Sequence, residues 1–313
     1  MKPVLRIDFC DLGPQWDKND NFLIPKLRTR FDVRIHSNPD ILIYGGSGNH
    51  HRLYTGRRLF MTGEAIPPDF PACDYAITPL RHPDPRHFRL PCYAWECEPQ
   101  HLLQKSPEEI ERVIAGKSEF CAFVVSYSHP KSRRRVDLFH KLSRYKKVNS
   151  GGRLLNNVGG PLPHGRPAKI EFLKKHKFVI CFENDSIPSY VSEKPCDAVE
   201  AGCIPIYWGD PELARDFNPK AVVNAADFAS LDHVVARVVE IDNDPALYRS
   251  ILGTPLLHGN KPGPDFDVNR LCDFFERILA DPGVPRGSRG LRTFFKNWNR
   301  WTLVKRDKVQ GRR

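Results

Sequence analysis

KFVICFENDSIPSYVSEKPCDAVEAGCIPIYW, residues 177–208, contains the pattern of a strand, a polar loop, a helix and a second strand. The apolar runs KFVIC and IPIYW are typical of buried strands, and the helix-like segment between them ends at Gly202, as a helix commonly does. A helix that joins two strands forms a βαβ unit, and such units build parallel sheets. This stretch therefore predicts an α/β fold.

The same alternation continues on both sides of this stretch. Before it, the pattern predicts strands at 3–9, 31–35, 40–46, 57–64, 73–79 and 119–128, and helices at 21–30, 106–116, 133–145 and 169–177. After it, the pattern predicts helices at 233–241, 244–252 and 268–280. Ser106 and Glu109 have the spacing of a capping box at the start of one helix. We interpret that helix as the connector between two doubly wound lobes, with a ligand at the carboxyl ends of the strands in the cleft.

Length and composition favour a folded, two-domain protein. The chain has 313 residues, of which 40% are hydrophobic and 11% aromatic. No apolar run approaches the 18 residues of a membrane span, and the first residues lack the pattern of a signal peptide. The nine cysteines are scattered in apolar runs without a CxxC pair, which indicates reduced thiols in a cytoplasm and no zinc site.

Positive charge is concentrated at the end of the chain. The net charge is +11, and residues 286–313 hold ten Lys or Arg and one Asp, so they account for +9. The remaining chain is close to neutral, at about +2, and needs no polyanionic partner.

Residues 183–194 end the first strand of the quoted stretch with a cluster of polar side chains. Ser192 is a candidate helix cap, and Pro195 is tolerated in a first turn. The start of a helix attracts phosphate, and Lys194 adds a full charge there, whereas Glu193 suits the hydroxyls of a ribose. Tyr190 and Asn184 could contact the rest of a nucleotide. A capped helix with a surface ion pair explains the same residues without a ligand.

Two other segments have the composition of a phosphate site. HPKSRRR, residues 129–135, follows a predicted strand and opens a helix, and its three arginines suit a diphosphate or a solvated helix start. NSGGRLLNNVGG, residues 149–160, is a glycine-bounded loop that contains Arg153 and allows close approach of the backbone to a ligand.

The ordered pattern over these segments resembles the signature of the α-1,3/4-fucosyltransferases, glycosyltransferase family 10, of the bacterial type. The matching parts are Phe182-Glu183-Asn184, Tyr190 to Lys194, Ala198 to Pro205 and Phe217-Asn218-Pro219. MTGE, residues 61–64, resembles a segment of the family's first domain, with Met61 where an aromatic residue is common. The resemblance covers roughly residues 20–280.

The resemblance implies a GT-B fold of two Rossmann-like doubly wound lobes with the active site in the cleft between them. We expect an N-terminal acceptor-binding domain at 1–116, a C-terminal GDP-fucose-binding domain at 117–285 and a basic tail at 286–313. The implied reaction transfers L-fucose from GDP-β-L-fucose, with inversion, to O3 of N-acetylglucosamine or to another hydroxyl of an acceptor glycan. The linkage formed is α-1,3 or α-1,4.

The resemblance also assigns roles to individual residues. Glu64 is the expected catalytic base, since an inverting displacement needs one group to take the acceptor proton. The expected diphosphate ligands are Arg135, with Arg134 as its nearest competitor, and Lys194. Glu193 is expected to bind the ribose. The donor pocket is completed by Asn184, Tyr190 and Arg153. Glu183 is a candidate for a structural role.

A metal is not expected to be obligatory. The tripeptides DND, residues 242–244, and DFD, residues 265–267, lie next to late helices, and we interpret them as turns rather than as metal ligands. Cations at the phosphates remove the need for a metal, and stimulation by manganese stays open.

The basic tail has Leu291, Phe294, Phe295 and Trp298 at helical spacing. Such a helix suits an anionic membrane or a packing site on the body of the protein. A lipid-linked acceptor would favour the membrane, so the prediction is a cytoplasmic protein, peripheral on the inner face. Two rival functions are a transferase for another nucleotide sugar and a nucleic-acid-binding protein, and the second leaves the cluster at 183–194 unexplained. We therefore expect no nucleic acid partner.

Overall fold

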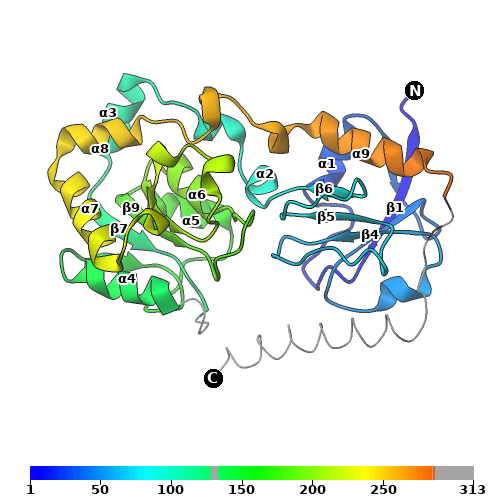
Figure 1. Ribbon diagram of the computed structural model, residues 1–313, viewed down its shortest axis with the longest axis horizontal. Helices are drawn as coiled ribbons and strands as arrows, with labels where there is room; N and C mark the ends of the chain where they lie inside the picture. Colours follow the sequence, from blue (N-terminus) through cyan, green and yellow to red (C-terminus); the bar gives the residue numbers. More distant parts are fainter. Residues whose placement is uncertain (128–132, 284, 286–313) are drawn as a thin grey trace. The chain divides into compact units, whose positions relative to one another are not determined.

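The computed structural model describes residues 1–127, 133–283 and 285, which divide into two compact units. Unit 1 consists of Met1–Pro91 together with the described residues from Pro264 onward, and unit 2 consists of the described residues of Cys92–Gly263. Each unit contains its own parallel sheet (Figure 1).

Unit 1 has a six-stranded sheet in the order β2-β1-β3-β4-β5-β6, and all neighbouring strands are parallel. Its strands are β1 (Val4–Cys10), β2 (Asp32–Ile35), β3 (Ile41–Tyr44), β4 (Arg57–Met61), β5 (Tyr75–Thr78) and β6 (His87–Arg89). Every residue of β3 and β5 is buried, as expected for strands covered on both faces.

Among the described residues, two α-helices cover unit 1, one from each half of the chain. They are α1 (Leu23–Arg28) and α9 (Val268–Ala280), and Figure 1 shows them side by side. Asp267 caps α9 by accepting a hydrogen bond from the backbone N–H of Asn269 at 2.9 Å. The predicted bounds of α9 are confirmed, because its apolar residues recur at helical spacing and its cap is an aspartate.

Unit 2 has a five-stranded parallel sheet in the order β11-β10-β9-β7-β8. Its strands are β7 (Glu119–Phe123), β8 (Val148–Ser150), β9 (His176–Phe182), β10 (Ile204–Trp208) and β11 (Val223–Asn224). The sequence pattern does not predict β6, β8 and β11, because runs of two or three residues are too short to show a period.

The α-helices described in unit 2 are α2 (Tyr93–Glu96), α3 (Pro107–Ala115), α4 (Arg133–Ser143), α5 (Arg166–Leu173), α6 (Lys194–Glu200), α7 (Leu231–Asn243) and α8 (Pro245–Leu252). Helices α4, α5 and α6 connect successive strands of the sheet, whereas α2 and α3 precede β7 and α7 and α8 follow β11. Short 3-10 turns occur at η1 (His50–Leu53) in unit 1, η2 (Pro99–Leu102), η4 (Leu213–Arg215), η5 (Pro219–Ala221), η6 (Ala225–Asp227), η7 (His258–Asn260) and, again in unit 1, η8 (Pro264–Phe266). The capping box at Ser106 and Glu109 is confirmed, with both hydrogen bonds present.

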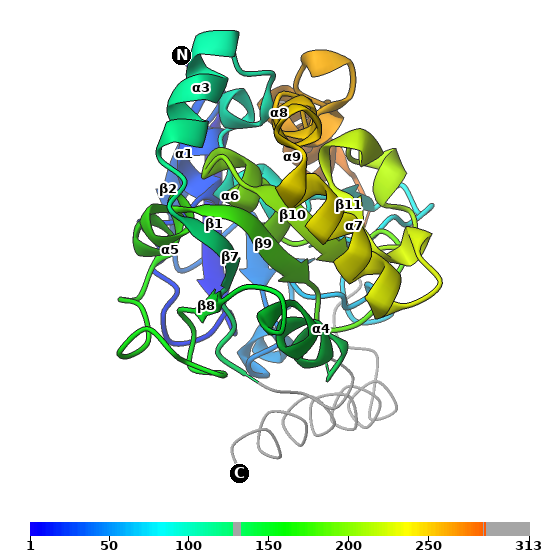
Figure 2. The ribbon, with the colours of Figure 1, turned by 90° about the vertical axis from the view of Figure 1, so that its left-hand side faces the viewer.

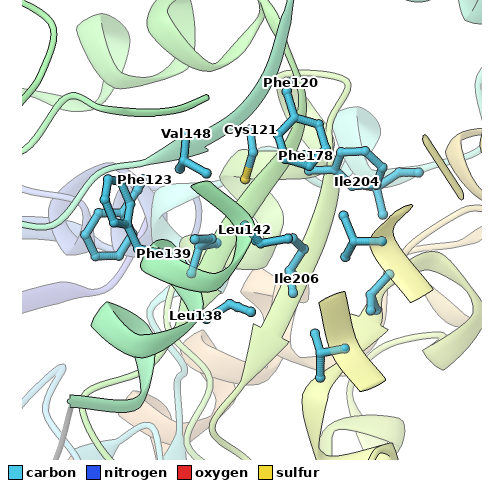
Figure 3. Packing of buried hydrophobic residues seen from close by; sticks show 14 of the residues in the cluster. Phe120, Cys121, Phe123, Leu138, Phe139, Leu142, Val148, Phe178, Ile204 and Ile206 are labelled. Carbon is cyan, nitrogen blue, oxygen red and sulfur yellow. The ribbon is translucent and has the colours of Figure 1, made fainter. Parts of the chain in front are cut away.

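The core of unit 2 lies between its sheet and the helices α4, α7 and α8. Figure 3 shows Leu138, Phe139 and Leu142 of α4 packed among side chains of the sheet, including Phe123 and Ile206. Leu138, Phe139 and Leu142 are the buried apolar residues of this helix, whereas Val136 is only half-buried.

The division into units differs from the predicted domain boundary at residue 116. Helix α3, which we interpreted as the connector, lies within unit 2, and its Ile110 and Val113 pack against the core of that unit. Residues 264–283 belong to unit 1 rather than to the C-terminal domain. Neither fact follows from local periodicity, since both depend on which core an amphipathic face meets.

The glycine-bounded loop after β8 packs closely against the end of β7. The backbone N–H of Leu154 donates to the carbonyl of Val125 at 3.0 Å, and a Cβ on Gly152 would lie 2.0 Å from that carbonyl oxygen. The predicted close approach is therefore real, but the neighbour that requires it is the protein's own backbone.

The basic tail at 286–313 and residues 128–132 of the HPKSRRR segment lie outside the described residues. The membrane contact of the tail and the cytoplasmic location stay predictions from sequence. Within the described residues, no helix has the length and apolarity to span a bilayer. All nine cysteines lie in the described part of the chain, and none forms a disulfide.

We predict that Gly152→Ala destabilises unit 2 by about 2 kcal/mol or more, because the added Cβ meets backbone atoms that cannot move aside. Thermal unfolding followed by circular dichroism should show a Tm lower by roughly 4 °C or more. Gly263→Ala is the matched control, since a Cβ there has no atom within 4 Å. Equal Tm values for the two variants would contradict the packing argument.

Candidate functional site

The strand order of unit 2 has a reversal point at β7, between β8 and β9. The chain passes from β7 to β8 on one side and then crosses to β9 on the other, so the connections diverge at β7. Ligands of open parallel sheets bind at such a reversal point. Figure 2 shows β7 and β9 running side by side toward the end of the sheet at which α4 lies.

Arg135 connects the segments that follow these two strands. Its Nη1 donates to Oδ1 of Asn184 after β9 at 2.9 Å, and its Nη2 donates to the carbonyl of Tyr127 after β7 at 2.7 Å. The residue is 3% exposed, and its buried Nε has no hydrogen-bond partner among the described residues. Burial lowers the pKa of Arg135, and the nearby carboxylate of Glu183 opposes this effect only in part. A buried guanidinium with an unused donor is suited to an anionic ligand.

Arg134 has a different environment from its neighbour. Its guanidinium carbon lies 5.3 Å from the ring centroid of Trp208, at the end of β10. Its Nε is also buried and without a partner in the described part of the chain. The two arginines therefore have different contacts. Arg135 bonds the segments that follow β7 and β9, whereas Arg134 lies over an aromatic ring.

Glu183 organises the loop between β9 and α6. Its carboxylate accepts hydrogen bonds from the backbone N–H of Ser192 at 2.9 Å, from Ser192 Oγ at 2.7 Å and from Lys194 Nζ at 2.7 Å. Glu183 is 1% exposed, and a Cβ on Gly209 would lie 2.5 Å from its Cγ, so the surroundings are closed around it. This buried carboxylate has a structural role, as expected for Glu183 from the sequence.

Lys194 is the first residue of α6, and its ammonium group makes two hydrogen bonds. In addition to the bond to Glu183, Nζ donates to Ser192 Oγ at 2.9 Å, which leaves one of its three N–H donors available. Burial would lower the pKa of Lys194, but the carboxylates of Glu183 and Glu193 outweigh burial and raise it. Lys194 therefore carries a positive charge at the carboxyl end of β9.

Glu193, rather than Ser192, is the N-cap of α6, and its side chain does not cap the helix. Ser192, the predicted cap, lies one residue before the N-cap position; its hydroxyl donates to Glu183 and accepts from the backbone N–H of Lys194, the first residue of the helix, at 3.4 Å. The Glu193 carboxylate instead accepts a hydrogen bond from Lys169 Nζ of α5 at 3.1 Å. Burial would raise the pKa of Glu193, but Lys194 and Lys169 outweigh burial and lower it to about 2. Glu193 is therefore ionised at neutral pH.

Tyr190 and Arg153 are less closely tied to this network. Tyr190 is half-buried in the loop before α6, and its backbone N–H donates to the carbonyl of Ile187 at 3.2 Å. Arg153 is exposed in the loop after β8, and its side chain has no hydrogen bond or ion pair with the described residues. Of the predicted donor residues, the structure brings Arg135, Asn184, Glu193 and Lys194 to the ends of β7 and β9.

Glu64 lies in unit 1, three residues after the end of β4. Its backbone N–H donates to Thr62 Oγ1 at 3.1 Å, and its side chain is exposed at the carboxyl edge of the sheet. The carboxylate makes no hydrogen bond or ion pair within the described residues, so Thr62, not Glu64, closes this turn. The position suits a base that must reach a ligand, and it leaves the predicted role untested.

The two acidic tripeptides serve helix ends. Asp244 caps α8 by accepting from two backbone N–H groups at 2.9 Å each, and Asp267 caps α9. Asp242 forms ion pairs with Lys146 and Lys177, and Asp265 pairs with Arg89. Within the described residues, no group of three or more His, Cys, Asp or Glu side chains is placed to hold a metal ion.

Sequence reasoning missed the residues that support Glu193. Asp197 of α6 is buried, ion-pairs with Lys169 at 2.7 Å and accepts from Arg166 Nε at 2.8 Å. Arg166 also pairs with Glu200 at 2.5 Å. The residues come from two helices that are distant in sequence, and no local pattern in either helix indicates that they meet.

Family models match most of the chain. The model described as the N-terminal domain of alpha-(1,3)-fucosyltransferase FucT matches residues 7–95. The model described as glycosyltransferase family 10 (fucosyltransferase), C-terminal, matches residues 114–252. The two matches fall in the two halves that the sequence analysis treats as separate lobes.

Individual relatives give the same result. Alpha-(1,3)-fucosyltransferase FucT of Helicobacter pylori is 30% identical over 301 residues, covering 82% of this chain and 62% of that protein. The human 4-galactosyl-N-acetylglucosaminide 3-alpha-L-fucosyltransferase FUT6 is 33% identical over 140 residues, covering 44% of this chain and 37% of that protein. The chain thus spans less than two thirds of the length of these relatives.

Solved structures confirm the fold. A crystal structure of an alpha1,3-fucosyltransferase with GDP-fucose matches with a TM-score of 0.75 and 26% identity. The match covers 91% of this chain and 93% of that chain. The expected GT-B type, with two Rossmann-like parallel sheets, is therefore confirmed.

We predict that Glu183→Gln destabilises unit 2 by about 3 kcal/mol, because it leaves the Lys194 ammonium half-buried without its carboxylate partner. Chemical unfolding at pH 7 measures the loss. Glu212→Gln is the control, since that carboxylate is more exposed and pairs with Arg215 on the surface, where a pair contributes less than about 1 kcal/mol. A Glu183→Gln variant as stable as the control would refute the structural role of Glu183.

A second prediction concerns the pH dependence of the Lys169–Glu193 pair. Because the folded pKa of Glu193 lies below its ordinary value, the pair stabilises the fold fully above about pH 4.5, and this contribution decreases as the pH falls toward 2. A double-mutant cycle of Lys169→Met and Glu193→Gln should show a coupling free energy at pH 7 that shrinks below pH 4.5. A coupling that is constant or grows on acidification would contradict the assignment.

Proposed function

The chain belongs to glycosyltransferase family 10, the fucosyltransferase family, and from this membership we propose that it transfers L-fucose from GDP-fucose to a hydroxyl of an acceptor glycan. The proposal extends to inversion at the transferred carbon and to O3 of N-acetylglucosamine as the accepting hydroxyl. The similar structure with GDP-fucose and the names of the curated relatives support the donor and the acceptor class.

One observation carries the donor side of the proposal. Consecutive residues at the carboxyl end of β9 each hold a cation, with Glu183 bonded to Lys194 and Asn184 bonded to Arg135. Each cation has an N–H donor without a hydrogen-bond partner among the described residues, namely the third N–H of Lys194 and the buried Nε of Arg135. Two neighbouring cations with spare donors match the two phosphates of a nucleoside diphosphate.

The remaining donor residues have roles that fit their environments. Glu193 is ionised and held by Lys169, so it is a hydrogen-bond acceptor for the ribose hydroxyls. Asn184 and Tyr190 border the nucleotide from the loop before α6. Arg153, which is exposed in the loop after β8, contacts the donor from the other side of β7.

The reaction follows from these assignments. The acceptor hydroxyl oxygen attacks the anomeric carbon of fucose as the bond from that carbon to the phosphate oxygen breaks. Glu64 takes the hydroxyl proton, and the electron pair of the broken bond leaves with GDP. Arg135 and Lys194 stabilise the negative charge that develops on the diphosphate. The two cations supply this charge, so the proposal includes no obligatory metal, and manganese would act as a stimulator.

The test combines transfer with nucleotide binding. We expect Glu64→Gln to lower transfer at least a hundredfold, since general base catalysis contributes about that much or more, while the affinity for GDP stays near the wild-type value. Lys194→Met should weaken GDP binding measured by calorimetry.

Two controls address the nucleotide specificity and the position of the replaced carboxylate. Titration with UDP and ADP beside GDP distinguishes a transferase for another nucleotide sugar, which would bind one of those nucleotides more tightly. Glu98→Gln replaces a carboxylate outside the proposed site and should retain activity. Turnover of Glu64→Gln near the wild-type rate would exclude Glu64 as the base.

A further inference from the structure

Unit 1 repeats the topology of unit 2. In the sheet order β2-β1-β3-β4-β5, the chain passes from β1 to β2 on one side and then crosses to β3 on the other. The order β8-β7-β9-β10-β11 in unit 2 is the same, and its reversal point at β7 and β9 holds the proposed donor residues. The equivalent reversal point of unit 1 lies at the carboxyl ends of β1 and β3, where a ligand of such a sheet is expected.

A pocket occupies this position in unit 1. Its volume is about 350 Å³, and its lining comes from the end of β1, the loop that follows, and the segment after β3. Among the lining residues are Asp11, Trp16, Lys18, Ser47 and His50. None of these residues has a role in the proposed reaction.

Asp11 fixes the two histidines that begin the 3-10 turn η1. Its Oδ1 accepts from the backbone N–H of His50 at 3.2 Å and lies 2.9 Å from His50 Nδ1. Its Oδ2 accepts from the backbone N–H of His51 at 2.9 Å and lies 2.8 Å from His51 Nδ1. The carboxylate is 1% exposed, and although burial raises its pKa, these hydrogen bonds outweigh burial and lower it. Since a carboxylate only accepts, each Nδ1 carries a proton.

The two histidines have different surroundings. His51 is buried and stacks on Tyr44, with ring centroids 4.0 Å apart, so it anchors the turn to the sheet. The His50 side chain is 82% exposed, and its Nε2 has no partner among the described residues. Anchoring the turn requires only His51 and the backbone N–H groups, so it does not account for the fixed orientation of the exposed His50 ring.

Trp16 is the aromatic wall of the pocket. Its ring lies 5.5 Å from Phe9 and 5.9 Å from Phe22, centroid to centroid, which fixes its orientation. Its indole N–H is buried and has no hydrogen-bond partner in the described part of the chain. A tryptophan ring offers an apolar surface to the C–H groups of a sugar ring, and its N–H can donate to a hydroxyl.

The charges around the pocket are internally matched. Asp11 is paired with the two histidines, and Lys18 forms an ion pair with Asp8 at 2.6 Å. The pocket therefore offers a phosphate no uncompensated cation. Fixed polar groups beside an aromatic surface are the features of a site for a neutral, hydroxyl-rich ligand.

We propose that this pocket binds a neutral saccharide, with Trp16 against the sugar ring and His50, oriented by Asp11, hydrogen-bonded to a hydroxyl. Resting on the proposed function, the saccharide is the N-acetylglucosamine-containing acceptor, and His50 and Trp16 are its binding residues. Glu64 follows β4, the strand next to β3, so the proposed base lies on the same carboxyl edge of this sheet as the pocket.

The test separates acceptor binding from donor chemistry. N-acetyllactosamine is the probe, and the full chain is assayed for transfer, for GDP-fucose hydrolysis without acceptor, and for saturation-transfer NMR contact with the disaccharide. We expect His50→Ala to raise the acceptor KM about tenfold, the effect of one lost hydrogen bond, without changing hydrolysis or the donor KM. Trp16→Phe should raise the acceptor KM less than Trp16→Ala, because it keeps an aromatic ring.

Leu53→Ala is the matched control, since Leu53 is exposed at the other end of the same 3-10 turn and should leave every readout unchanged. An unchanged acceptor KM in both His50→Ala and Trp16→Ala would overturn the proposal, as would the absence of saturation transfer from the wild-type protein to the disaccharide. A wild-type protein without fucosyl transfer or GDP-fucose hydrolysis would refute the proposed function. If that protein still showed saturation transfer to the disaccharide, and the His50→Ala variant did not, the saccharide pocket would be supported.

Discussion

The buried carboxylate of Glu183 is the interaction on which the arrangement of unit 2 at β9 depends. It accepts three hydrogen bonds from Ser192 and Lys194, and the loop between β9 and α6 closes around it. A carboxylate with almost no exposure is stable only when its charge is compensated and its oxygens are hydrogen-bonded. The cation that compensates it is thereby held at the strand end, where a diphosphate would need it.

Both units use the same topological feature for different chemistry. In each sheet the chain reverses its direction of growth at the first strand, and ligands of such sheets bind at the carboxyl ends of the two adjacent strands. Arginine and lysine lie near this position in unit 2, whereas in unit 1 an aspartate bonded to two histidines and a tryptophan lie there. The backbone creates the position, and the side chains after each strand determine whether an anion or a neutral ligand fits it.

Much of this fold is predictable from local pattern. The alternating pattern of β1, the apolar runs of β9 and β10 and the amphipathic period of α9 are strong signals, because each extends over several residues. The strand-end location of Asn184 and Lys194 also follows from sequence, since both come directly after or near a buried strand. The cap of α6 is harder, because the helix begins one residue later than a Ser192 cap requires, and the Ser192 hydroxyl bonds both Glu183 and the first N–H of the helix. The sequence shows which side chain is able to cap, but not the residue at which the helix begins.

The sequence by itself determined the alternation of strands and helices, the family to which the pattern belongs and the strand ends at which ligands would bind. Only the tertiary structure decided which charges meet: Arg135 with Asn184, Lys169 with Glu193, and Asp11 with His50 and His51. It also decided that α3 joins the core of unit 2 and that α9 returns to unit 1. The physical reason is that periodicity reports the burial of a residue's own face, whereas an ion pair or a core contact depends on which distant segment is packed against that face.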